Sequence, residues 1–432
     1  MYNNRLKIVL FGAGVIVLIL VVLSVFCVIP ITKNCSKTSV SGKLIFWGVD
    51  DVSAYQTVID NYSKLYNRKV QIQYQQIPEA DFENTFVRAM AKNQGPDILM
   101  FHNSWLIKQG DLLMPASDAQ ISLATFEQLF PLGPKNSGIE KDFVYQNKVY
   151  ALPLYLDTLA MFYNKDIFNA NAVVFPPENW NDFTNLATRL TKKQANGQIL
   201  QAGAAIGSSD KNIVNATDIL NTLMLQHGSL IVDPTFMRTD FSSKATNAFD
   251  FYTGFAKPAS SNYVWNQNLG NSFDLFSQGQ AAMIFGYANQ IAYLKQKNPL
   301  LNFAVATMPQ VDSSNPKNYA AYWGLAVSSK SLNSGLAWDF IKYITTDPQN
   351  SLTYLQATKR PPALKILINQ YLDNPDLNVF AKQALSATSW YQPDPDQTSQ
   401  IFSSAVESVL SGQLTSGRAL EKAASQLNNL FK

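Results

Sequence analysis

The apolar residues are most concentrated at the start of the chain. Residues 8–31 contain no charged side chain, and a helix of that length can cross the ~30 Å hydrocarbon layer of a membrane. A cleaved signal peptide is the alternative, but its apolar region is usually only about 7 to 15 residues long and ends in a small-x-small site. We therefore predict that residues 1–33 contain one uncleaved N-terminal transmembrane helix.

Beyond a polar, Ser-rich linker at 34–43, the hydrophobic pattern alternates between strand and helix. "KLIFWGV" and "DILMF" are apolar runs typical of buried strands, and "KVQIQYQQI" alternates with period two. "SAYQTVIDNYSKLYN" and "ADFENTFVRAMAKNQ" repeat apolar residues at helical spacing. The order strand, helix, strand, helix, strand predicts an α/β layer with parallel strands. In such layers ligands bind beyond the carboxyl ends of the strands, which here fall at 50–51, 75–76 and 102–105.

The pattern also predicts that the chain leaves this layer and returns to it. Pro153 interrupts "VYALPLYLDTLAMFYNKDIF", where we expect a crossing to a second lobe. The later strand "YWGLAVSS" and helix "GLAWDFIKYITT" predict the return, and "KRPP" predicts a further crossing. Trp180 and Trp338 lie on apolar helical faces and are expected in the cores. The predicted lobes are 44–153 plus 319–362, and 154–318 plus 363–432.

Composition narrows the class of protein. A chain of 432 residues is too long for one ordinary core, and 47% hydrophobic with 15% charged residues is typical of a folded globular protein. The net charge is only +3 and no basic run is interleaved with aromatics, so nucleic acid is not expected as a partner. Cys27 and Cys35 lie in or beside the predicted membrane segment, so the lobes cannot form an internal disulfide or a thiolate metal site. We expect neither a metal nor a cofactor.

Several sequence blocks, taken in order, resemble a known family. They are "PDILMFHNSW", "YALPLYLDTLAMFYNKDIF", "FPPENWNDF", "FSQGQAAMIFGY" and "YWGLAVSSKSLNSGLAWDFIKYITTDPQNSLTYLQATKRPP". Together they resemble extracellular solute-binding proteins of the carbohydrate-import type, which work beside ABC transporters and include the maltose-binding protein. The resemblance implies a periplasmic-binding-protein-like fold in which two α/β lobes, joined by a hinge, close on a sugar, with ABC permease subunits as partners. The predicted anchor departs from it, since most relatives are lipidated or free in the periplasm.

The strand ends of the first lobe supply candidate ligand contacts. A sugar site needs carboxylates or amides for the hydroxyls and flat rings for the C–H face. Asp50 and Asp51 follow the first strand, where the family places polar contacts, although they could instead cap the next helix. Asn103 and Trp105 match another contact loop of the family after the third strand. Phe101 matches a stacking ring of the maltose-binding relative, but strand alternation would equally bury it.

The resemblance carries three more candidates at the crossing into the second lobe and beyond it. Asp157 matches an acidic sugar-binding position of the same relative, with a structural salt bridge as the alternative. Tyr155 lies two residues before Asp157, so in an extended segment its side chain is expected to face the same side. Tyr287 ends "AAMIFGY", where the family usually presents an aromatic side chain to the cleft.

Three further candidates lie near the returning segments. Trp323, next to Gly324 at the start of a strand, is expected to face the ligand and not the core. Trp390 lies in a loop where relatives bring a late aromatic into the site, and core packing is its alternative. Arg360 could pair with a ligand carboxylate or hold the chain at the crossing. If Trp323 and Asp157 face the ligand, alanine in their place should weaken binding with little loss of stability.

The sequence and the resemblance together predict a monomeric, single-pass membrane-anchored sugar-binding protein whose lobes lie on the extracytoplasmic side. The alternatives are an adhesion or sensor module with the same lobes, or a protein that binds a peptide or polyol. A glycosidase could be imagined with Asp51 and Asp157 as its carboxylates. It is least expected, because no acidic pair has a recognisable catalytic spacing and no G-x-S-x-G, H-E-x-x-H or Walker motif occurs.

Overall fold

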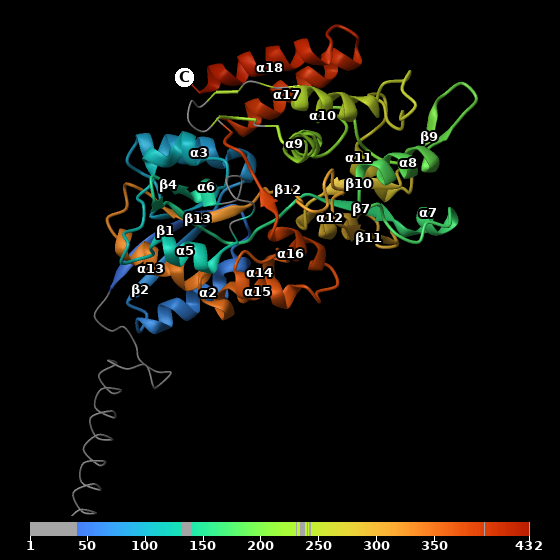
Figure 1. Ribbon diagram of the computed structural model, residues 1–432. Coiled ribbons are helices and arrows are strands. Elements are labelled where there is room, and N and C mark those ends of the chain that lie inside the picture. The colour runs from blue at the N-terminus through green and yellow to red at the C-terminus, as the bar shows by residue number, and fades with distance from the viewer. Residues whose placement is uncertain are drawn as a thin grey trace, which may run out of the picture.

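The computed structural model in Figure 1 describes residues 41–131, 133, 140–229, 231–233, 238, 239, 241, 243–392 and 394–431. The predicted membrane helix and residues 34–40 of the predicted linker lie outside the described residues. Within the described ranges, no helix is long and apolar enough to cross a membrane. The first strand begins at Gly42, so the predicted linker boundary at residue 43 lies inside that strand.

The first sheet has the strand order β2-β1-β3-β13-β6. Its strands are β1 (Gly42–Gly48), β2 (Val70–Gln76), β3 (Ile98–His102), β6 (Ala151–Pro153) and β13 (Trp323–Val327). β1 pairs in parallel with β2 and β3, which confirms the predicted parallel layer. β13 runs antiparallel to both of its neighbours, because the chain enters it on the return from the second lobe. Pro153 ends the edge strand β6, a position where the missing N–H is tolerated.

Helices cover both faces of the first sheet (Figure 1), with α3 (Glu79–Ala91) on one side and α2 (Ser53–Leu65), α13 (Ser334–Thr345) and α14 (Pro348–Thr358) on the other. α2 turns a face with Tyr55, Val58 and Tyr62 into the core. Trp338 of α13 is completely buried, as its apolar helical face predicted. We call this sheet and its helices the first lobe.

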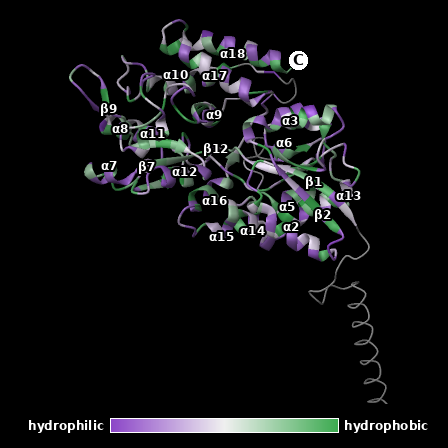
Figure 2. Ribbon diagram, turned by 180° about the vertical axis from the view of Figure 1, so that it is seen from behind, coloured by the Kyte–Doolittle hydropathy of each residue, from purple (hydrophilic) through white to green (hydrophobic). Residues whose placement is uncertain are grey.

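The second sheet is antiparallel, with the order β10-β7-β11. Its strands are β7 (Ala160–Asn164), β10 (Met283–Gly286) and β11 (Phe303–Ala306). The second lobe comprises this sheet and α7 (Lys165–Ala170), α8 (Trp180–Leu190), α9 (Ala216–Gln226), α10 (Ser243–Gly254), α11 (Ser272–Ser277), α12 (Asn289–Lys297), α17 (Pro395–Leu410) and α18 (Ser416–Leu430). Trp180 is buried here, as predicted. Figure 2 shows hydrophilic and hydrophobic residues on the same helices, such as α18, as expected for helices that bury one face.

Shorter described elements complete the fold. They are α4 (Leu106–Gln109), η1 (Gly110–Leu112), α5 (Leu123–Leu129), α6 (Glu140–Phe143), β4 (Val144–Tyr145), β5 (Lys148–Val149), β8 (Lys192–Lys193), β9 (Ile199–Gln201), β12 (Asn318–Tyr319), α15 (Lys365–Tyr371), α16 (Asn378–Ala384) and β14 (Ala387–Thr388).

The two lobes are connected where chain segments cross side by side. Residues 154–159 lead from β6 to β7, and residues 320–322 lead from β12 to β13. These two segments are bonded to each other, with Ala321 N donating to Asp157 O at 3.2 Å. β12 also pairs in parallel with β14, so a third segment joins them. We call these three segments, residues 154–159, 318–322 and 387–389, the joint.

Gly324 tests how closely β13 packs in the centre of the first sheet. A Cβ at Gly324 would lie 2.6 Å from Leu152 O and 2.7 Å from the ring of Phe143. Gly324→Ala should therefore lower the free energy of unfolding by about 1 to 3 kcal/mol, because backbone cannot move aside as a flexible side chain can. Chemical denaturation measures the change. Gly335→Ala is the matched control, since nothing lies within 4 Å of its Cβ, and an equal loss in both variants would contradict the close approach.

Candidate functional site

Asp50 is held by tyrosines at the carboxyl end of β1. Its Oδ2 accepts hydrogen bonds from Tyr55 Oη at 3.1 Å and Tyr354 Oη at 2.8 Å. Its neighbour Asp51 accepts from the backbone N–H of Ser53 at 2.9 Å, and hydrogen bonds with Ser53 lower the pKa of that carboxyl. Both aspartates thus lie at the sheet edge where the sequence predicted them, and Asp51 also bonds at the start of α2.

Asp157 lies in the joint and is only 1% exposed. Its carboxylate accepts from Thr158 N at 2.9 Å and, from the second lobe, from Ala288 N at 3.0 Å. Arg360 Nη1 lies 4.0 Å from Asp157 Oδ2, and the guanidinium lies over the ring of Tyr155 at 4.6 Å. Burial raises the pKa of Asp157 to about 7, although the charge of Arg360 opposes the rise.

The guanidinium of Arg360 has N–H groups that donate no hydrogen bond to the described residues. Its nearest ion pair, with Asp157, is at 4.0 Å, and within the described part of the chain it donates no hydrogen bond. Burial opposes its charge, but Tyr155, Tyr354 and Asp157 around it raise its pKa, so it remains a cation. A partly buried cation with free N–H groups is suited to hydrogen-bonding oxygen atoms of a ligand.

An interlobe cavity of about 500 Å³ opens beside Asp50 and Arg360. The end of β1, the start of α2 and the end of α14 line it from the first lobe, while α12 lines it from the second, and residues from Tyr371 to Leu377 close one wall. Its polar lining residues are Asp50, Asp51, Ser53, Asn289, Lys295, Gln356, Thr358, Lys359, Arg360, Tyr371, Asn374 and Asp376. Of the residues predicted to bind ligand, it brings together Asp50, Asp51 and Arg360.

The predicted aromatic contacts of the first lobe gather in one buried cluster. Trp323 packs edge-on against Trp105, with ring centroids 5.0 Å apart, and against His102 at 5.2 Å. Phe101 also packs edge-on against Trp105, with ring centroids 5.8 Å apart. Burial lowers the pKa of His102 to about 4, so its ring is neutral. Trp323 is only 4% exposed, so we no longer expect its replacement by alanine to leave stability unchanged.

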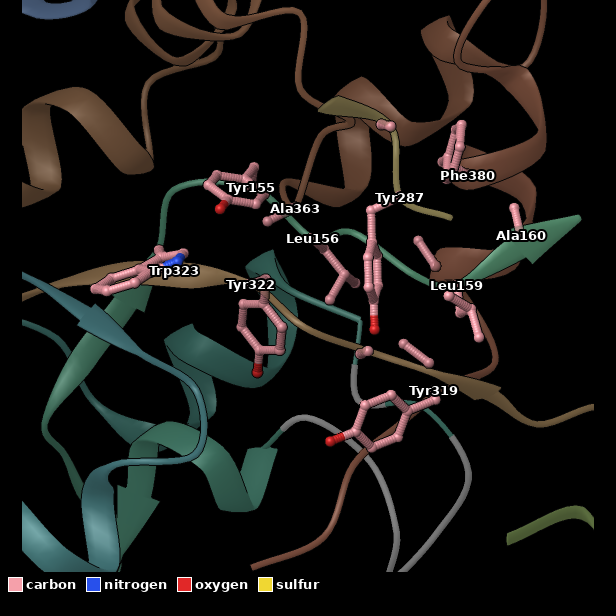
Figure 3. Packing of buried hydrophobic residues seen from close by; sticks show 14 of the residues in the cluster. Tyr155, Leu156, Leu159, Ala160, Tyr287, Tyr319, Tyr322, Trp323, Ala363 and Phe380 are labelled. Atoms are coloured by element: carbon pink, nitrogen blue, oxygen red, sulfur yellow. The ribbon is translucent and has the colours of Figure 1, made fainter. Parts of the chain in front are cut away.

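Tyrosines line the joint from both lobes. Figure 3 shows Tyr155, Tyr287, Tyr319, Tyr322 and Trp323 gathered where the segments cross. They are buried in the described structure. The joint therefore combines aromatic faces with hydroxyl groups, which are both chemical types expected of a sugar site.

Tyr287 follows β10 and bonds to an aspartate that the sequence analysis did not single out. Its Oη donates to Asp218 Oδ2 at 2.7 Å. Burial raises the pKa of Asp218 to about 7, with the bond from Tyr287 opposing the rise. Asp218 stands in the first turn of α9, where an acidic residue is common, so its helical position gave no signal of a role at the joint.

Asn103 is engaged within the protein. Its Oδ1 accepts from Tyr322 N at 3.2 Å, and its Nδ2 donates to Asp142 at 3.0 Å. Asp142 is a second buried carboxylate that the sequence analysis missed. Trp390 packs edge-on against Phe402 of α17 at 6.5 Å, and its indole N–H is buried without a partner among the described residues. The described residues also contain no cluster of three or more His, Cys, Asp or Glu suited to a metal.

Two α/β lobes, joined by crossing segments and separated by a polar cavity, are the architecture of a two-lobed binding protein. The family described as "Bacterial extracellular solute-binding protein" matches residues 48–351, and the chain belongs to this family. It is therefore a solute-binding protein of the kind that works with ABC transporters.

Relatives and solved structures agree with this assignment. A probable ABC transporter-binding protein of Deinococcus radiodurans is 25% identical over 78% of this chain and 80% of its own. The galactooligosaccharide-binding protein of Bacillus subtilis is 26% identical over 69% of each chain. The cyclic alpha-maltosyl-1,6-maltose binding protein of Arthrobacter globiformis has the same fold, with a TM-score of 0.75 at 16% identity over 91% of this chain and all of that one.

Replacement of Trp323 tests its burial. Trp323→Ala should lower the free energy of unfolding by about 3 to 5 kcal/mol, because it leaves a cavity inside the aromatic cluster. Trp323→Phe keeps a ring there and should lose less. Denaturant titration of both variants measures the effect, and an unchanged stability of Trp323→Ala would return this side chain to an exposed position.

The raised pKa of Asp157 predicts the pH dependence of stability. The folded-state pKa is about 7 and the ordinary value is 3.8, so the stabilisation from this proton is fully present below about pH 4 and is lost as the pH rises through 7. Thermal unfolding between pH 4.5 and 8.5 should show a melting temperature that declines toward high pH, and Asp157→Asn should flatten part of that decline. Asp312→Asn is the control, because Asp312 is exposed and its pKa is lowered by bonds to Ser314. An identical slope in wild type and Asp157→Asn would rule out this titration.

Proposed function

We propose that this protein captures a sugar or oligosaccharide between its lobes, outside the cytoplasmic membrane, and delivers it to an ABC permease. The observation that carries the proposal is the interlobe cavity, whose lining combines carboxylates, amides and an arginine from both lobes. Its volume of about 500 Å³ lies within the usual range for small-molecule sites.

The chemistry of the lining suits sugar hydroxyls, which both donate and accept hydrogen bonds. Asp50 and Asp51 accept, Arg360 donates, and the amide of Asn289 can do either. Asp50 is oriented by two tyrosine hydroxyls, so its remaining acceptor capacity has a fixed direction. Support also comes from the names of relatives, which include a galactooligosaccharide-binding protein and a maltotriose-binding protein of Pyrococcus abyssi.

The mechanism is conformational and involves no chemical conversion of the sugar. A ligand that contacts Asp50 in the first lobe and Asn289 in the second gains both sets of contacts only when the lobes are close. The lobe arrangement then shifts by as much as the ligand prefers the closed form. Tyr155 and Asp157 lie in the joint itself. We therefore propose that a ligand contacting them acts directly on the segments at which the lobes bend.

The remaining parts of the proposal concern the membrane. We propose that residues 8–31 anchor a monomeric binding protein on the extracytoplasmic side, and that the Ser-rich linker holds the lobes near the permease. Tethering would raise their effective concentration at that partner without any new contact. The predicted lobe boundaries at 153/154 and 318/319 fall in or beside the joint and remain part of this proposal.

A ligand panel tests the function. The full chain in detergent micelles is titrated with monosaccharides, malto- and galacto-oligosaccharides, polyols and peptides, with tryptophan fluorescence and thermal melting as readouts. We expect a saturable shift with one group of sugars and recovery of the sugar unaltered. Cleavage of the sugar would indicate an enzyme, a shift with peptide or polyol would change the solute class, and silence across the panel would contradict sugar capture.

Arg360 offers the sharpest variant once a sugar from the panel binds. Arg360→Gln should weaken its affinity by about 10- to 100-fold, because a charge-assisted hydrogen bond is lost. Lys359→Gln is the matched control, since Lys359 lines the same cavity but is exposed. Isothermal titration calorimetry measures both, and an equal effect in the two variants would assign the result to general charge and not to Arg360.

A further inference from the structure

Asp142 occupies a position that neither sugar binding nor the family assignment explains. It stands in the short helix α6 of the first lobe, and the residue is only 4% exposed. Three side chains converge on it. Asn103 Nδ2 donates to Oδ2 at 3.0 Å, Tyr322 Oη donates to Oδ2 at 2.7 Å, and Ser389 Oγ donates to Oδ1 at 2.5 Å.

These three donors come from segments far apart in the chain. Asn103 follows β3 of the first sheet, Tyr322 stands in the segment from β12 to β13, and Ser389 follows β14. Asn103 and Tyr322 are also bonded to each other through backbone, with Asn103 N donating to Tyr322 O at 3.0 Å. One carboxylate therefore fastens two segments of the joint to the first lobe.

We propose that Asp142 is the positioning residue of the joint. The crossing segments hold their observed arrangement only while the Asp142 carboxyl is buried and bonded to Asn103, Tyr322 and Ser389 in place of water. The arrangement places Tyr322 and, next to it, Trp323. Any motion that draws β14 away from the first lobe breaks the contact with Ser389 and lets water reach the carboxylate. The inference does not depend on which solute binds.

The titration of Asp142 predicts the direction in which the stability of the joint changes with pH. Burial raises its pKa to about 7, while the hydrogen bonds from Ser389, Tyr322 and Asn103 oppose the rise. Asp142 therefore holds its proton more tightly when it is buried among these three donors than when its carboxyl is hydrated. Its stability is present at low pH and falls as the pH rises through about 7.

The tyrosines around Asp142 do not supply this titration. Tyr319, Tyr322 and Tyr391 face it from the crossing segments, and burial raises their pKa values, so they stay neutral near pH 7. Glu140 and Lys141 are its neighbours on α6. Asp157 also has a pKa of about 7, and its backbone O accepts from Ala321 N at 3.2 Å beside β12, so its titration adds to the pH dependence there. The Asp142→Asn variant separates the two contributions, because it leaves Asp157 intact.

Hydrogen exchange of the full chain in detergent micelles, without ligand, tests the proposal. Peptides that cover β12 and β14 report the backbone bonds Asn318 N to Ser386 O and Ala320 N to Thr388 O. After correction for intrinsic exchange, we expect wild-type protection there to fall by about tenfold between pH 6 and pH 8. Protection in Asp142→Asn should fall clearly less than in wild type over this range, because the neutral amide removes the titration of Asp142 and leaves that of Asp157.

Two further variants keep the result decisive. Asp218→Asn is the control, because Asp218 is a partly buried carboxylate with a pKa of about 7 that bonds to Tyr287 away from α6, and it should keep the wild-type pH dependence at β14. Tyr322→Phe removes one opposing hydrogen bond and should move the midpoint to higher pH. An unchanged pH dependence in Asp142→Asn, or an equal change in β7 of the second lobe, would overturn the proposal. Failure of the sugar panel would leave this result untouched.

Discussion

Burial of carboxylates at the joint is the constraint on which the arrangement of the two lobes depends. A carboxylate removed from water is costly unless neighbouring donors replace its hydration. Asp142 and Asp157 each find such donors on more than one chain segment. The segments must therefore stay together, or the carboxylates must regain water. Local helix and strand formation alone would leave the two sheets free to take many relative positions.

The same constraint bears on the lobe closure that we propose for ligand binding. The joint consists of a few short segments, while each sheet is enclosed by helices with buried aromatic and aliphatic side chains. Bending at the joint is thus easier than deforming either core, because well-packed interiors resist small changes of shape. In the function that we propose, a solute contacts Asp50 in one lobe and Asn289 in the other, and both line the cavity beside the joint. That proposal makes binding, closure and the protonation of the joint linked equilibria.

The candidate site could be predicted only in part. Asp50, Asp51 and Arg360 were singled out because the ends of strands and crossing segments can be located from hydrophobic patterns, and all three line the cavity. Trp323, Trp105 and Phe101 were correctly placed near one sheet edge but form a buried cluster. Asp142 and Asp218 were missed. A single acidic residue in a short helix or a first helical turn is usually explained by helix capping or by exposure to solvent.

The sequence by itself determined the elements, the parallel layer of β1, β2 and β3, and the burial of Trp180 and Trp338. It could do so because strand and helix periodicities are local, and each repeats over a few residues of one segment. Only the tertiary structure decided that β13 runs antiparallel to β3, that Arg360 lies over Tyr155, and that Asp142 gathers three distant segments. Those facts depend on which segments meet, and contacts between residues as far apart as Asp142 and Ser389 leave no periodic trace in the chain.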